Sequence, residues 1–290
     1  MDLMEAAVLG LVQGATEYLP VSSSGHLVLV PWLLGWQKAP FAFDVLVQLG
    51  TLLGVIVYFW QDLVEMARAM LRGLMTRKPF EDPQARLGWL VGVATVPAAV
   101  LGLLLEDHVE EVFGSARGTA AFLLLTATLL AISEKLSRRQ PPLPEIKLPH
   151  AIMIGFSQAL ALFPGVSRSG ATLSGALLLG LDREKGARFS FLMSIPVMVG
   201  AGLLTGRKVV ANPEMLANLG PAIAVGFVTA AISGYIVIRW FLGFLKTRSL
   251  YVFSVYCFTV GLLGVIFVEE PTSEPASANT QATESAPENP

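Results

Sequence analysis

Cysteine and charge are both scarce in this sequence. A single cysteine, Cys257, stands among 290 residues, which excludes an internal disulfide framework or a site built from several thiolates. Only 14% of the residues are charged, against about 25% in a typical globular protein, and 53% are hydrophobic, which excludes an intrinsically disordered chain. The net charge of −2 provides no basic surplus, so nucleic acid is excluded as the main partner.

The chain has long apolar runs instead. A helix needs about 17 to 25 residues to cross the roughly 30 Å of hydrocarbon in a bilayer. Runs that reach or approach this length are predicted to span the lipid bilayer at residues 45–61, 87–105, 118–133, 189–206, 215–238 and 249–268. The sequence therefore predicts an all-α integral membrane protein with a single polytopic domain over residues 1–268. Cys257 lies in the last run and is predicted to pack there, against lipid or between helices.

Two further apolar regions are each interrupted by a polar turn. The turn at 20–26 separates residues 6–19 from 27–35, and the turn at 164–170 separates residues 151–163 from 171–181. Each arm is too short to span the membrane as a helix. We therefore expect two re-entrant helical hairpins whose turns face an interior cavity, because backbone at membrane depth must find polar partners. Two spanning helices with kinks are the alternative.

Basic and acidic residues gather in different connections. Lys and Arg cluster in the connecting loop 62–86 and in residues 135–149, 183–188 and 239–248, whereas acidic residues cluster in 106–111 and after residue 268. Because basic connections are retained in the cytoplasm, both termini are predicted to be external. Residues 269–290, rich in Pro, Ser and Glu, are predicted to form a disordered acidic external tail.

The two polar turns are copies of one another. An offset of 145 residues places Gly10 on Gly155, Gln13 on Gln158, Ser22 on Ser167, Ser24 on Ser169, and Gly25 on Gly170. The match continues into the apolar runs, so each half, about 1–134 and 150–268, holds one hairpin and three crossings. Because an odd number of crossings reverses the side of entry, the sequence predicts an inverted-topology repeat, and the turns at 20–26 and 164–170 should meet near the bilayer midplane. Chance similarity between small-residue apolar segments is the alternative.

Both turns have the composition of an anion site. Each leads into the N-terminus of a half-helix, where unpaired N–H groups and the helix dipole favour phosphate. Arg168 adds a guanidinium, although a purely structural ion pair with Glu17 is an alternative for it. The residues predicted to bind phosphate with Arg168 are Ser22, Ser24, Gly25, Ser167, Ser169 and Gly170.

Candidate acid–base groups lie on the first hairpin only. Gln13 and Glu17 are four residues apart, so they share a helix face that could ligate a hard divalent cation, and Glu17 could transfer protons. His26 follows the turn and, beside Glu17, could take a proton from a hydroxyl or attack phosphorus; a satisfied structural histidine is the alternative. In the second copy Leu162 stands where Glu17 would be, which predicts a structural role for Gln158.

Polar residues at the start of the first full crossing could join this group. Asp44, Gln48 and Thr51 could each add a polar contact to the cavity. Solvation at a helix end explains Asp44 equally well, so its role stays open.

Residues 13–26 (QGATEYLPVSSSGH) and 163–172 (FPGVSRSGAT) resemble the two signature segments of the undecaprenyl-diphosphate phosphatases, the bacitracin-resistance family. The resemblance covers residues 1–268. It implies hydrolysis of undecaprenyl diphosphate in the bacterial inner membrane to undecaprenyl phosphate and inorganic phosphate, which recycles the carrier lipid of peptidoglycan synthesis and confers bacitracin resistance. It also implies a Mg²⁺ or Ca²⁺ ion, and a catalytic set of Glu17, Ser23, His26 and Arg168.

The resemblance leaves two points of mechanism open. The family often has Glu at the position of Gln13; an amide can ligate or orient but carries no charge, so a metal would depend on Glu17 and on the substrate's own phosphates. The nucleophile could be Ser23 activated by His26, His26 itself, or an activated water.

The competing function is transport. Inverted repeats with broken helices are typical of secondary transporters, so a lipid-phosphate flippase or an anion carrier could use the same site. Glu17 and His26 favour the hydrolase, because a passive anion site gains little from a neighbouring carboxylate. An oligomer is compatible with the sequence, which does not specify one.

Overall fold

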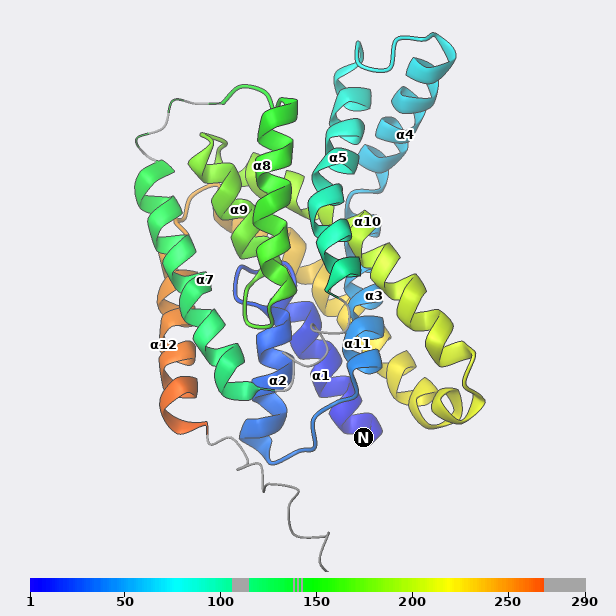
Figure 1. Cartoon of the computed structure of the whole chain (residues 1–290), viewed down its shortest axis with the longest axis vertical. Helices are drawn as coiled ribbons and strands as arrows, with labels where there is room; N and C mark the ends of the chain where they lie inside the picture. Colours follow the sequence, from blue (N-terminus) through cyan, green and yellow to red (C-terminus); the bar gives the residue numbers. More distant parts are fainter. Residues whose placement is uncertain (106–114, 138, 140, 142, 269–290) are drawn as a thin grey trace, which may run out of the picture.

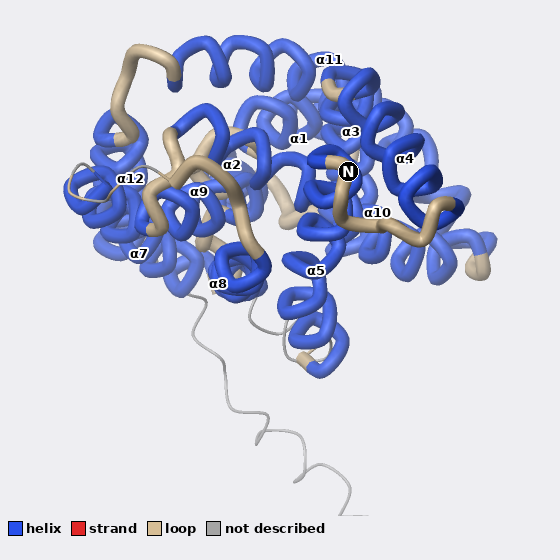
Figure 2. The backbone as a smooth tube through the Cα atoms, turned by 90° about the horizontal axis from the view of Figure 1, so that it is seen from above, coloured by secondary structure: helices blue, strands red, loops and turns tan. Residues whose placement is uncertain are grey.

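The computed structural model describes residues 1–268 apart from 106–114, 138, 140 and 142. The predictions for the acidic segment 106–111 and for the tail 269–290 lie outside these residues. The described chain is helical and contains no strand (Figures 1 and 2). Its helices are α1 (Leu3–Thr16), α2 (Ser23–Leu34), α3 (Phe41–Tyr58), α4 (Trp60–Met75), α5 (Pro83–Leu104), α7 (Ala116–Ser137), α8 (Leu148–Ala159), the short 3-10 helix η1 (Leu160–Leu162), α9 (Arg168–Leu178), α10 (Arg183–Val210), α11 (Pro213–Leu245) and α12 (Tyr251–Phe267). The prediction of an all-α protein is confirmed.

Helices α3, α5, α7, α10 and α11 are long and apolar enough to cross a membrane. They correspond to the first five predicted crossings, as expected of a multi-pass membrane protein. The sixth predicted crossing, 249–268, is α12, an apolar helix of 17 residues at the lower end of the spanning length. Helices α1, α2, α8 and α9 have only 11 to 14 residues, so none of them is long enough to cross alone.

The prediction of a connecting loop over 62–86 is wrong for its first part, where α4 forms instead. This helix packs antiparallel beside the start of α5 (Figure 1). Met66, Ala69 and Gly73 are buried at helical spacing, whereas the neighbouring charged residues Glu65 and Arg68 are exposed. Because the apolar stripe is so narrow, charged residues dominate the composition of the segment, and this composition indicated a loop.

Both predicted polar turns are present, each between two short helices, and they are built alike. Each return helix begins at a serine N-cap: the Ser22 hydroxyl oxygen accepts from the Gly25 N–H at 3.2 Å, and that of Ser167 accepts from the Gly170 N–H at 3.0 Å. In Figure 1, α1 and α2 occupy the half of the molecule that contains the N-terminus, and α8 and α9 occupy the opposite half.

The two polar turns meet in the interior, as predicted. The Gly165 N–H donates to the Ser24 hydroxyl at 3.4 Å, and the Ser169 hydroxyl donates to the Leu19 carbonyl oxygen at 2.9 Å. Residues about 145 positions apart in the chain are thereby joined directly. This contact places the polar groups of both hairpins in one region.

Glycines let the first arm of each hairpin pack closely on a long helix. α1 packs along α11, and α8 packs along α5. A Cβ atom at Gly10 would overlap the carbonyl oxygen of Gly226, and a Cβ at Gly155 would overlap that of Ala94. Gly10 and Gly155 are equivalent under the sequence offset, so both hairpins use the same device.

We expect Gly10→Ala to destabilise the protein by about 1–3 kcal/mol, because the added methyl group must push two helix backbones apart. The measurement is the midpoint of thermal unfolding in detergent, which should fall by several degrees. Gly92→Ala is the matched control, since a Cβ at this helical glycine meets no heavy atom within 4 Å in the described structure. Equal midpoints for the two variants would contradict close packing of α1 on α11.

Candidate functional site

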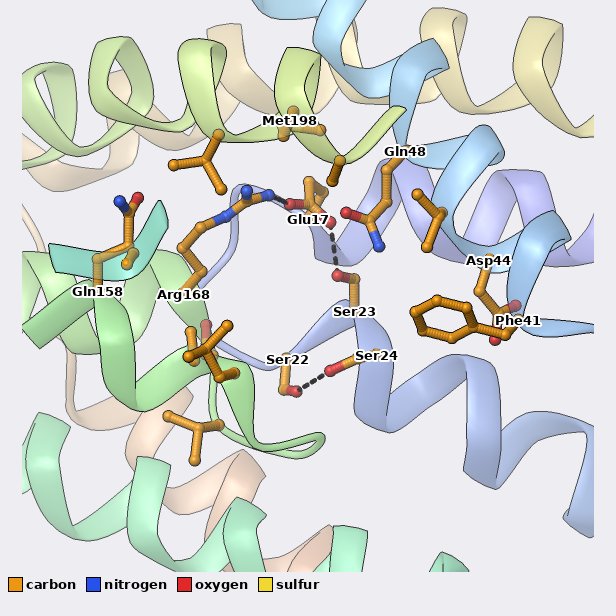
Figure 3. Close-up of a pocket in the computed structure, with 18 residues that line it drawn as sticks. Glu17, Ser22, Ser23, Ser24, Phe41, Asp44, Gln48, Gln158, Arg168 and Met198 are labelled. Carbon is orange, nitrogen blue, oxygen red and sulfur yellow. Dashed lines mark hydrogen bonds and ion pairs between the residues drawn. The ribbon is translucent and has the colours of Figure 1, made fainter. Parts of the chain in front are cut away.

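A cavity of about 190 Å³ lies where the two turns meet (Figure 3). Both hairpins and α3 contribute to its walls, and α5 and α10 complete them. Its polar lining consists of Glu17, Ser22, Ser23, Ser24, Asp44, Gln48, Gln158, Ser167 and Arg168. Six of the predicted site residues, from two segments far apart in the sequence, therefore face one cavity: Glu17, Ser22, Ser23, Ser24, Ser167 and Arg168.

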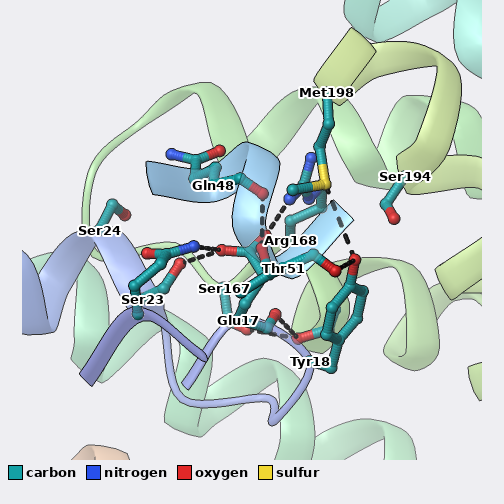
Figure 4. Close-up of polar contacts among 12 residues, drawn as sticks. Glu17, Tyr18, Ser23, Ser24, Gln48, Thr51, Ser167, Arg168, Ser194 and Met198 are labelled. Carbon is teal, nitrogen blue, oxygen red and sulfur yellow. Dashed lines mark hydrogen bonds and ion pairs between the residues drawn. The ribbon is translucent and has the colours of Figure 1, made fainter. Parts of the chain in front are cut away.

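Glu17 is the centre of the polar contacts in this cavity (Figure 4). Its side chain is buried, and the residue is 6% exposed. The Ser23 hydroxyl donates to Oε2 at 2.6 Å, and the Gln13 amide donates to the same oxygen at 2.6 Å. Arg168 pairs with Oε1. The carboxylate therefore holds a hydroxyl and a guanidinium on its two oxygens, an arrangement in which it could accept the hydroxyl proton.

Arg168 is the first residue of α9, directly after the cap Ser167. Its ion pair with Glu17 uses Nη2, and the guanidinium has five N–H donors in all. The side chain lines the cavity and is 17% exposed. The structural pair with Glu17 is thus present, and it is compatible with a second contact from the guanidinium to a bound anion.

The residues predicted to bind phosphate divide into two groups. Ser22, Ser24 and Ser167 line the cavity. Gly25 and Gly170 do not, and their N–H groups donate to the serine caps. Ser169 does not line it either, and its hydroxyl donates to the Leu19 carbonyl oxygen in the first turn. The first two N–H groups of each return helix have no intrahelical acceptor, so those at Ser23 and Ser24 and those at Arg168 and Ser169 are the better candidates.

His26 lies away from Glu17, contrary to expectation, and does not line the cavity. Its Nδ1 is 2.7 Å from the Ser22 carbonyl oxygen, one turn back along α2. Its Nε2 is 2.7 Å from the Tyr256 hydroxyl on α12. Between them, these two partners turn the ring toward α12. The hydrogen-bond partner of the Ser23 hydroxyl is therefore Glu17 and not His26.

Residues of α3 and α8 also face the cavity. Asp44 and Gln48 line it, and Oδ1 of Asp44 is buried without a hydrogen-bond partner among the described residues. Thr51 is fully buried elsewhere and donates to the Gln48 carbonyl oxygen. The structural role predicted for Gln158 differs from its placement: its amide lines the cavity, and both polar atoms lack partners in the described structure. Its equivalence to Gln13 in the repeat was the sequence feature that could have indicated a place in the site.

Each turn is also held by a helix that sequence reasoning did not connect to it. Thr126 on α7 donates to the Gly165 carbonyl oxygen and accepts from the Ser167 N–H, both at 3.0 Å. Cys257 on α12 donates to the Pro20 carbonyl oxygen at 3.5 Å. Cys257 is completely buried, which confirms interhelical packing. No local pattern distinguishes Thr126 from Thr119 and Thr128, the other two threonines of the apolar helix α7.

A second cavity of about 290 Å³ adjoins the first. It lies between α3, α5 and α10, and most of its lining side chains are apolar. The residues shared by the two cavities are Phe41, Val45, Ala98, Leu162, Val197 and Ala201. A cavity that holds Glu17, Arg168 and several serines thus adjoins one lined mainly by apolar side chains, as a ligand with a charged head and a hydrocarbon tail would require.

The divalent cation expected at Glu17 and Gln13 finds suitable oxygen atoms but no complete ligand set. Oε1 of Gln13 is a buried acceptor without a partner among the described residues. Both oxygens of Glu17 already accept from other groups, and the described part of the chain has no group of three or more His, Cys, Asp or Glu side chains that could hold a metal ion. A cation here would need further ligands from a bound anion.

Comparison with known proteins agrees with this picture. The family model described as bacitracin resistance protein BacA matches residues 6–263. A Thermomicrobium roseum protein named undecaprenyl-diphosphatase is 41% identical over 275 residues, which are 92% of this chain and 99% of that protein. A Myxococcus xanthus protein of the same name is 42% identical over 277 residues, 96% and 93% of the two chains. One from Paenarthrobacter aurescens is 43% identical over 264 residues, 90% and 95% of the two. Since both the family model and these relatives match nearly the whole membrane domain, the chain belongs to the BacA family of bacitracin resistance proteins.

Proposed function

We propose that this protein is an undecaprenyl-diphosphatase, which hydrolyses undecaprenyl diphosphate to undecaprenyl phosphate and inorganic phosphate. The observation that carries the proposal is the contact of Glu17 with both Ser23 and Arg168 inside a buried polar cavity. A hydroxyl, a carboxylate and a guanidinium in contact are the groups that phosphoryl transfer to a protein nucleophile requires. The names of the relatives support the same substrate.

The substrate fits the two adjoining cavities by its chemistry. The diphosphate occupies the polar cavity, where Arg168 and the free N–H groups at the starts of α2 and α9 meet its charge. The first isoprene units occupy the apolar cavity between α5 and α10, and the rest of the chain lies in the bilayer. Lateral entry between these helices keeps the hydrocarbon out of water throughout.

Ser23 is the nucleophile that the contacts favour. As its oxygen attacks the terminal phosphorus, Glu17 takes the hydroxyl proton and the bond to the bridging oxygen breaks, which releases undecaprenyl phosphate. Glu17 then passes its proton to solvent. In the second step Glu17 takes a proton from water, the hydroxide attacks the phosphoserine, and the proton returns to the Ser23 oxygen as inorganic phosphate leaves. Arg168 stabilises the transferring group in both steps.

A divalent cation belongs to this proposal as well. Gln13, through its unpartnered Oε1, and Glu17 would hold a Mg²⁺ or Ca²⁺ ion together with the substrate's phosphate oxygens. When bound, the ion would neutralise part of the diphosphate charge.

We further propose that the fold is an inverted-topology repeat of two halves, each a re-entrant hairpin plus three transmembrane helices. Three equivalent pairs support it: the serine caps, the packing glycines, and the contacts of Thr126 with Gly165 and of Cys257 with Pro20. Pro20 and Gly165 are themselves 145 residues apart. The two hairpins also enter from opposite ends of the molecule (Figure 1).

The distribution of basic residues supports an orientation in the bacterial inner membrane. The start of α5, the end of α7 and the start of α8 lie on the side opposite the N-terminus (Figure 1), and basic residues stand at or beside these helix ends in the chain: Arg86, Lys135 and Lys147. Because basic ends face the cytoplasm, both termini are proposed to be external. The first hairpin, with Glu17 and Ser23, would then enter from outside.

The direct test is phosphate release from undecaprenyl diphosphate by the detergent-purified protein, with and without Mg²⁺ or Ca²⁺. We expect release that depends on the cation and stops on chelation. Folded protein that binds the lipid without releasing phosphate would overturn the phosphatase and favour the lipid-phosphate transporter.

A further inference from the structure

Tyr256 on α12 reaches the first polar turn through His26. The tyrosine hydroxyl lies 2.7 Å from Nε2 of His26, and the two rings are stacked at an interplanar angle of 5° with centroids 5.7 Å apart. His26 is buried, whereas Tyr256 is 43% exposed. The contact joins residues 230 positions apart in the chain.

The partners of His26 determine which of its nitrogens carries hydrogen. Nδ1 lies 2.7 Å from the Ser22 carbonyl oxygen, and a carbonyl oxygen can only accept, so Nδ1 is the donor. In the neutral ring Nε2 is then an acceptor for the Tyr256 hydroxyl. If the ring is charged, both nitrogens donate. In either state His26 has no free lone pair with which to attack phosphorus or take a proton.

The carbonyl group that His26 holds belongs to a strained residue. Ser22 has φ +68°, a conformation that non-glycine residues rarely adopt. Its carbonyl oxygen accepts both the His26 side chain and the His26 backbone N–H, the latter at 3.2 Å. In the second turn, the equivalent Ser167 has an ordinary φ of −70°, and Ala171 stands at the position of His26. The extra hydrogen bond is therefore present only where the backbone is strained.

We propose that Tyr256 and His26 are positioning residues for the hydrolysis and do not touch the reacting atoms. Together they hold the strained Ser22 peptide, and Ser23 follows it directly with its hydroxyl 2.6 Å from Glu17. Loss of either partner lets the turn relax and moves the Ser23 hydroxyl away from the carboxylate. This inference rests on the proposed phosphatase function. It links α12 to the position of the Ser23 hydroxyl through Tyr256 and its hydrogen bond to His26.

The test compares kcat and KM for phosphate release in Tyr256→Phe, His26→Asn and His26→Ala. Tyr256→Phe should lower kcat about tenfold, the effect of one lost hydrogen bond, with KM within about twofold of wild type. Asparagine places an amide N–H where Nδ1 of histidine lies, so His26→Asn should keep at least about ten times the activity of His26→Ala. Tyr251→Phe, a second tyrosine of α12, is the control and should match wild type.

Two further measurements separate positioning from direct chemistry. The pH profile of kcat/KM should have the same shape in His26→Asn as in wild type, since no proton passes through the ring. Acid quenching during turnover should trap an acid-stable phosphoserine in both proteins. An acid-labile phosphohistidine, a pH inflection lost in His26→Asn, or His26→Asn no more active than His26→Ala would overturn the proposal. Wild-type activity in folded Tyr256→Phe would overturn the part played by the tyrosine. Folded wild type without phosphate release would instead overturn the proposed function itself.

Discussion

Replacing Arg168 with alanine should lower kcat/KM for phosphate release by about 10³ to 10⁵-fold, the range known for an arginine that stabilises a transferring phosphoryl group. The variant loses two things at once. The diphosphate loses the arginine that lines its cavity, and Glu17 is left as a buried carboxylate without its guanidinium partner. The measurement is phosphate release from undecaprenyl diphosphate at saturating and limiting substrate.

Two further variants test whether the effect depends on the guanidinium group of Arg168. Arg168→Lys keeps the positive charge but loses the planar guanidinium, so it should recover only part of the activity. Arg188→Ala removes an arginine that also joins two helices, through an ion pair with Asp62, but lies outside the cavity. It should retain wild-type turnover. Near-normal activity in folded Arg168→Ala would contradict a phosphate clamp at this position.

Replacing Ser23 with alanine should lower the rate of phosphate release by at least about 10³-fold, because the covalent step loses its nucleophile. Ser24 is the matched comparison, since it lines the same cavity but its hydroxyl contacts Ser22 and Gly165 and not Glu17. Ser24→Ala should cost about tenfold or less, the effect of one hydrogen bond. Phosphate release under single-turnover conditions measures both variants.

A double variant tests whether Ser23 and Glu17 act as a unit. If Glu17 takes the proton of Ser23, the combination of Glu17→Gln with Ser23→Ala should be no slower than Ser23→Ala alone. Effects of the two substitutions that multiply would show that they act independently. Such a result would favour water as the nucleophile, activated by Glu17 without the serine.

The sequence predicted the composition of the site better than its internal contacts. A repeated motif at fixed offset indicated that two distant turns meet, and this brought Arg168 to Glu17. Helical spacing correctly indicated that Gln13 and Glu17 share a face. These predictions succeeded because one depends on a motif that occurs twice and the other on the spacing of residues along a single helix.

Contacts that depend on the packing of distant helices could not be predicted. Tyr256 and Thr126 lie in apolar helices that also carry other hydroxyl side chains, and nothing near them in the chain indicates which turn they bind. The His26 ring points toward Tyr256 on α12, so the prediction that His26 lies beside Glu17 was wrong. The helix α4 was missed because only three of its residues are buried.

The contacts of α12 with the first turn also bear on the order in which the site forms during synthesis. The hairpin with the nucleophile is made first, yet its hydrogen bonds to Tyr256 and Cys257 span 230 and 237 residues of the chain. A nascent chain that ends before α12 contains Ser23 and Glu17 but lacks the helix that holds their turn. We therefore expect full hydrolytic activity only after α12 has been inserted, because a shorter chain lacks both of these contacts with the turn.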